Sequence, residues 1–199
     1  MKHPDLLATL AVFALIATIT PGPTTALVIA SGARHGFKGS VPLIVGMASG
    51  ICLLAAASAA GLGAAVHSVP QLQVVMQGLG SAYLLWLAWM IGTSGAPRSA
   101  ESYSSPVGFL GAFLLTWLSP KAWTIVIAAA ATFANLTSSA TSLAILMALA
   151  FGLAGAFSAS VWCIGGLLLS RRLTTERQWQ AVNAALATVL VLCIVRLWL

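Results

Sequence analysis

The chain has 199 residues, of which 60% are hydrophobic and 6% charged, and its formal net charge is +6. Its mean hydropathy is +1.01, whereas soluble domains carry about 25% charged residues. This balance excludes a soluble globular domain, and no basic run is long enough to predict binding to nucleic acid. The composition predicts an all-α integral membrane protein, because only helices satisfy every backbone group over such apolar stretches.

Six stretches are long and apolar enough to cross a membrane, which takes about 20 residues each. They cover residues 5–33, 42–66, 70–93, 106–135, 140–169 and 180–198. We expect the first stretch to be retained rather than removed as a signal peptide, because Pro21 stands where a small-residue cleavage site would lie. The six stretches fill almost the whole chain, so residues 1–199 are predicted to form a single membrane domain.

The basic residues predict the orientation of these helices. Those between the helices lie in the first, third and fifth connections, at Arg34, Lys38, Arg98, Arg171, Arg172 and Arg177. The second and fourth connections contain no lysine or arginine. By the positive-inside rule the basic connections are cytoplasmic and both termini lie outside. We expect a multi-pass protein of a bacterial-type inner membrane, with the lipid bilayer as its surroundings.

Two of the predicted helices are interrupted by proline at corresponding places. Thr20-Pro21-Gly22-Pro23 interrupts the first helix and Ser119-Pro120-Lys121-Ala122 the fourth, about half a chain length apart. An interior proline removes a backbone hydrogen bond, and in a membrane the freed carbonyls must find protein, water or a ligand. One proline alone is often only a kink. Two prolines around a glycine favour a functional break.

The segments that follow the two breaks resemble each other. Residues 24–30 and 124–130 are both small, apolar and partly β-branched. The next helices carry small-residue clusters at Gly46, Gly50, Gly152 and Gly155. Close helix packing alone also explains such clusters. Together these features predict an inverted 3+3 repeat, with units 1–96 and 104–199, which is typical of transporters whose site lies near the bilayer midplane.

Lys121 is a charged residue near the middle of a predicted helix. A charge there costs about 2.5–3.5 kcal/mol on insertion scales. The three acids, Asp5, Glu101 and Glu176, lie at helix ends or in connections and cannot neutralise it. Its partner could be the carbonyl end of the half-helix that stops near Ser119, water in a cavity, or a substrate carboxylate. The plainer alternative is that Lys121 only caps the broken helix.

The N–H groups freed after the two prolines predict a second anion-binding element, because half-helix N-termini carry partial positive charge. Nearby hydroxyl groups would complete a pocket. The predicted substrate-binding residues are Thr20, Pro21, Gly22, Pro23, Thr24, Thr25, Ser119, Pro120, Lys121 and Thr124. A small zwitterion suits this pocket, with its carboxylate at the positive helix ends and its ammonium at exposed carbonyls.

The sequence lacks the residues that other functional classes require. There is no Walker motif and no nucleophile–base–acid set, so we expect neither an enzyme nor a cofactor. The three histidines are scattered and predict no metal site. Cys52, Cys163 and Cys193 lie in apolar stretches and are interpreted as packing residues.

The chain is similar to the lysine exporter superfamily of amino-acid exporters. The matching motifs lie at residues 20–23, 35–38, 46–50, 80–89, 119–122 and 195–197. The family commonly has asparagine where this chain has Ser119, and many members have aspartate where it has Ile51. The missing acid argues against lysine or arginine as substrate. The cysteine/O-acetylserine exporter branch also lacks it and shares the run 86–89.

The resemblance implies a secondary transporter that exports small neutral amino acids or their derivatives. Two alternatives stay open: a transporter of another small solute, such as a metal ion or a xenobiotic, and a non-transporting membrane scaffold. A metal ion would require intramembrane carboxylates or histidines. A scaffold would need neither paired helix breaks nor an unpartnered lysine. The sequence is also compatible with a homo-oligomer.

Overall fold

The described residues of the chain are helical, with short turns between helices. The computed structural model describes residues 4–63, 68, 70–94 and 107–198, and no strand occurs among them. The elements are α1 (Pro4–Ile19), α2 (Pro23–Ala59), α4 (Pro70–Gly92), α5 (Phe109–Trp117), α6 (Pro120–Thr132), the 3-10 turn η1 (Ala134–Leu136), α7 (Ala140–Ser170) and α8 (Glu176–Trp198). The expected all-α class is therefore confirmed. Three expected features lie outside the described residues, namely Arg98, Glu101 and the boundary between the two repeat units.

Four helices are long and apolar enough to cross a membrane, namely α2, α4, α7 and α8. The α5–α6 pair, bent by 63° at its break, passes the same test as a fifth span, and α1 is a shorter apolar helix. Large apolar side chains point outward, among them Trp89 at 74% exposure, Leu153 at 70% and Leu110 at 65%. Such a surface fits lipid rather than water.

The connection expected between the first two helices is a sharp kink inside α2, where two helical segments meet. Only Gly36 leaves the helical conformation inside α2, with φ 66° and ψ −176°. A positive φ of this size is available to glycine at little cost. A break is therefore present within the expected connection, residues 34–41, but the helices extend up to Gly36 from both sides instead of ending at residue 33 and resuming at residue 42.

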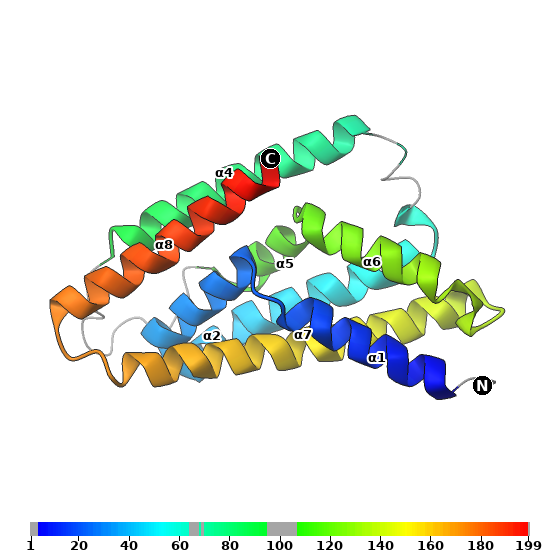
Figure 1. Cartoon of the computed structure of the whole chain (residues 1–199), viewed down its shortest axis with the longest axis horizontal. Coiled ribbons are helices and arrows are strands. Elements are labelled where there is room, and N and C mark those ends of the chain that lie inside the picture. Colours follow the sequence, from blue (N-terminus) through cyan, green and yellow to red (C-terminus); the bar gives the residue numbers. More distant parts are fainter. Residues whose placement is uncertain (1–3, 64–67, 69, 95–106, 199) are drawn as a thin grey trace.

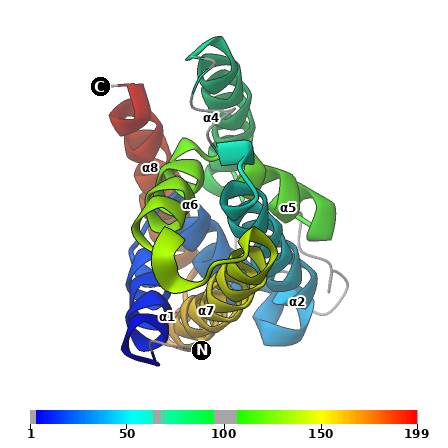
Figure 2. The same cartoon turned by 90° about the vertical axis from the view of Figure 1, so that its right-hand side faces the viewer.

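Helix α7 lies against α2 over the largest interface among the described helices, and α4 pairs with α8 along one side (Figures 1 and 2). At the crossing of α2 and α7 the backbones nearly touch. A Cβ built on Gly32 would lie 2.2 Å from the carbonyl oxygen of Cys163. A Cβ built on Gly166 would lie 2.1 Å from that of Ile29. Glycine is required on both helices at this crossing.

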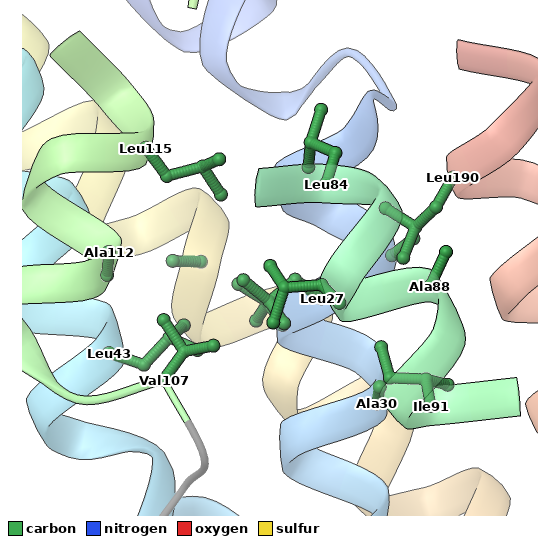
Figure 3. Packing of buried hydrophobic residues seen from close by; sticks show 14 of the residues in the cluster. Leu27, Ala30, Leu43, Leu84, Ala88, Ile91, Val107, Ala112, Leu115 and Leu190 are labelled. Carbon is green, nitrogen blue, oxygen red and sulfur yellow. The ribbon is translucent and has the colours of Figure 1, made fainter. Parts of the chain in front are cut away.

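The buried apolar residues form two clusters. The first joins α2, α4, α5, α7 and α8, and Figure 3 shows Leu43, Leu84 and Leu190 among its members. The second joins α1, α2, α6 and α7 around Leu10 and Phe151. Since α2 and α7 contribute to both clusters, these two helices form the frame that carries the two broken helices.

Candidate functional site

The first break separates α1 from α2. Helix α1 ends at Ile19, and neither Pro21 nor Pro23 has an N–H that could continue its hydrogen bonds. Gly22 is the N-cap of α2 in an extended conformation, and its carbonyl oxygen accepts hydrogen bonds from the N–H groups of Thr25 and Ala26. Pro23 occupies the first helical position, where its fixed φ suits a helix start.

The second break has the same chemistry. Helix α5 ends at Trp117, and Ser119 is the N-cap of α6, with Pro120 at the first helical position. The N–H of Ala122 donates to the Ser119 hydroxyl at 3.4 Å. The indole N–H of Trp123 donates to the Trp117 carbonyl oxygen at 2.8 Å and so occupies the carbonyl end of α5.

The two breaks meet through Lys121. Its ammonium group donates to the carbonyl oxygens of Thr20 at 3.3 Å and Pro21 at 3.5 Å. A Cβ built on Gly22 would lie 3.3 Å from the same nitrogen, so the glycine leaves room for the lysine. The carbonyl end that receives Lys121 is therefore that of α1. The end of α5 near Ser119, the other carbonyl end considered for Lys121, receives the indole N–H of Trp123 instead.

Helix α7 supplies the other donors to the end of α1. The hydroxyl of Ser158 donates to the Thr18 carbonyl oxygen at 2.9 Å. The indole N–H of Trp162 donates to the Ile19 carbonyl oxygen at 3.2 Å. Sequence reasoning missed both residues, although polar side chains in an apolar helix were an available signal.

Two cavities adjoin Lys121. The smaller, of about 100 Å³, lies among α1, α2, α5, α6 and α7 and includes Thr116, Ser158 and Trp162 in its wall. The larger, of about 350 Å³, includes Leu84 and Cys193 in its wall together with both breaks. Lys121 therefore lines both cavities, together with Thr24 and Ser119.

The cavities bring together nine of the ten residues predicted from the sequence. Thr20 and Thr25 line the smaller cavity, Pro21, Gly22, Pro23 and Pro120 the larger, and Thr24, Ser119 and Lys121 line both. Thr124 lines neither, because it is exposed and its hydroxyl donates to the Pro120 carbonyl oxygen of its own helix at 3.0 Å.

The site combines positive helix ends with a negative one. The N–H groups of Thr24 and Lys121 have no backbone hydrogen bond among the described residues, and each lies at the start of a half-helix. Such N-termini favour anions. Asp5 and Glu176, the acids in the described part of the chain, begin α1 and α8 and line neither cavity. The arrangement suits a group that is negative at one end and positive at the other.

Comparison with known proteins identifies the family. The family model for the LysE type translocator matches residues 15–199. The cysteine/O-acetylserine efflux protein of Salmonella typhimurium is 31% identical over 196 residues, covering 98% of both chains. The protein of the same name from Escherichia coli K12 is 30% identical over 203 residues, again with 98% of both chains covered. No solved structure matches. The chain belongs to the family of LysE type translocators.

Proposed function

We propose that this protein is a secondary transporter that exports small neutral amino acids, or derivatives such as O-acetylserine, across a bacterial inner membrane. The observation that carries the proposal is the meeting of two helix breaks at Lys121, which lines both cavities. The names of the relatives, cysteine/O-acetylserine efflux proteins, support the substrate class. Alternating access would expose the site to each side of the membrane in turn.

The proposed site binds both ends of a zwitterion. The substrate carboxylate binds the Lys121 ammonium and the N–H groups of Thr24 and Lys121. The substrate ammonium binds the carbonyl oxygens of Thr20 and Pro21, which Lys121 contacts in the present structure. A substrate would therefore enter between two groups of opposite charge that are already in contact. A second positive charge on the substrate would find no acid among the described lining residues.

We further propose that the helices make six spans in an inverted repeat. In this arrangement α1 and α2 up to Gly36 form one broken span, and α5 and α6 form its counterpart. The matching caps, Gly22-Pro23 and Ser119-Pro120, support the pairing. The packing also supports it, because α1 packs on α7 as α5 packs on α2, and α4 pairs with α8. A two-fold axis in the membrane plane that relates the two repeats would turn the α1–α7 contact into the α5–α2 contact and would leave the α4–α8 pair as a pair.

The distribution of basic residues supports an orientation for this bundle. The bend within α2 and the α7–α8 connection lie at the same end of the molecule, at the left of Figure 1. This end carries Arg34, Lys38, Arg171, Arg172 and Arg177. The described residues 59–63 and 133–139, at the other end, contain no lysine or arginine. We propose that the basic end is cytoplasmic and that both termini are outside.

The test is efflux from vesicles that contain the purified protein and a panel of labelled amino acids, with and without a pH gradient. Saturable exit of cysteine, O-acetylserine or another small neutral amino acid is expected. Lys121→Met keeps an unbranched side chain of nearly the same length but removes its charge. Hydrogen bonds to charged groups are worth about 1.5–3 kcal/mol, so transport efficiency should fall about 10- to 150-fold. Lys38→Met makes the same change in an exposed side chain outside both cavities and is the control.

Two results would contradict the proposal. If no member of the panel leaves faster than from empty vesicles, although the protein is correctly inserted, the amino-acid assignment fails. If wild type exports an amino acid and Lys121→Met exports it equally well, the assigned site fails while the exporter function stands.

A further inference from the structure

We infer that Ser158 and Trp162 of α7 are positioning residues of the transport site. They hold the carbonyl end of α1 opposite Lys121 and thereby fix the half of the site that receives the substrate ammonium. The inference rests on the proposed function. It assigns a role to α7, a helix that contributes no residue to the site predicted from the sequence.

The end of α1 needs donors from outside its own helix. The last carbonyl groups of any helix lack partners within it. Here Pro21 and Pro23 cannot donate, and the hydrocarbon of a bilayer offers no water. The structure provides donors to four consecutive carbonyl groups: Ser158 to Thr18, Trp162 to Ile19, and Lys121 to Thr20 and Pro21.

The hydroxyl of Ser158 donates to an uncommon type of acceptor. Serine in a helix usually donates to the carbonyl of its own preceding turn, as Ser160 does toward Ala156. Ser158 is only 3% exposed, yet it donates to a carbonyl 140 residues away in the chain. Trp162 lies one turn later on the same face and donates to the next carbonyl of α1, that of Ile19. Two donors on successive turns of α7 therefore define both the position and the direction of the end of α1.

These contacts are part of the wall of the site. Ser158 and Trp162 line the smaller cavity together with Thr20 and Lys121. Without them, only the Lys121 ammonium would donate to these four carbonyl groups, and the substrate carboxylate competes for that same ammonium. The α7 donors keep the Thr20 and Pro21 carbonyls in place when Lys121 turns to the substrate.

The experiment compares Ser158→Ala and Trp162→Phe, which each remove one donor, with Ser160→Ala and Trp89→Phe. The controls make the same changes at a serine bonded within its own helix and at an exposed tryptophan. Efflux of labelled cysteine, kept reduced, is measured from vesicles. Loss of one neutral hydrogen bond should raise KM about three- to tenfold in each test variant, with the maximal rate changed by less than about twofold. The controls should match wild type.

A second ligand separates positioning from general damage. 3-Mercaptopropionate is cysteine without its amino group, so it uses the Lys121 side of the site alone. Its inhibition constant should stay within about twofold of the wild-type value in both test variants. Equal shifts for cysteine and 3-mercaptopropionate would assign the two residues a merely structural role and overturn the inference. Unchanged KM values in variants of an active exporter would also overturn it, and would leave the proposed function intact. An inactive wild type would instead refute the proposed function itself.

Discussion

The close crossing of α2 and α7 makes a quantitative prediction about Gly166. An alanine Cβ there would lie 2.1 Å from the carbonyl oxygen of Ile29. Carbon and oxygen in close contact normally stay about 3.3 Å or more apart. The two backbones would therefore have to separate by about 1 Å. The adjacent Gly165 has no atom within 4 Å of its built Cβ, so it offers a matched control.

The expected cost follows from comparing the two variants. Replacing a glycine inside a helix by alanine contributes about 0.5–1 kcal/mol of stability, and this gain is common to both. Overpacking costs about 1–3 kcal/mol and applies only to Gly166→Ala. Because the obstacle is backbone rather than a flexible side chain, we expect the upper end of this range. For a chain of this length, a difference of ~3 kcal/mol corresponds to a melting temperature of Gly166→Ala that is lower than that of Gly165→Ala by about 6–12 °C.

The assay is thermal unfolding in one detergent at one scan rate, followed by tryptophan fluorescence. Gly165→Ala should unfold at the wild-type temperature or slightly above it, and Gly166→Ala well below. Transport by Gly166→Ala should also fall, because α7 carries Ser158 and Trp162, which hold the end of α1. Equal melting temperatures for the two variants would refute the close backbone contact on which the reasoning depends.

Two further predictions concern the larger cavity and the α4–α8 pair. Cys193 lines this cavity with Lys121. In a variant whose only cysteine is Cys193, a small thiol reagent should therefore label this cysteine more slowly when O-acetylserine is present at a saturating concentration. Labelling at the same rate with and without ligand would place the substrate elsewhere. The buried Asn183 side chain donates to the Ser94 carbonyl oxygen at 2.6 Å, and Asn183→Leu should lower stability by about 1–3 kcal/mol by leaving that carbonyl unpaired. The control is Thr188→Val, because the Thr188 hydroxyl donates within the same helix, and this variant should unfold at the wild-type temperature. Equal losses of stability in both variants would show that the hydrogen bond to Ser94 does not contribute to stability.

The local chemistry of the breaks could be predicted from the sequence. Pro21, Pro23 and Pro120 end one helix and begin the next because proline lacks an N–H wherever it stands. The break at Gly36 lies within the connection expected at residues 34–41, but the sequence did not show that a single positive φ would make the turn without a loop. Thr124 was included because its hydroxyl lies near the second break in the sequence, which does not show that this hydroxyl donates to the Pro120 carbonyl oxygen of its own helix.

The sequence by itself determined that the chain is a helical membrane protein with two broken helices and a lysine at one of them. These properties depend on composition and on covalent geometry within a few residues. Only the tertiary structure decided which carbonyls Lys121 contacts and which helix holds them. Lys121 is separated from its acceptor Thr20 by 101 positions, and Trp162 from Ile19 by 143. These contacts depend on how α6 and α7 are placed against the end of α1, and no local pattern encodes that placement.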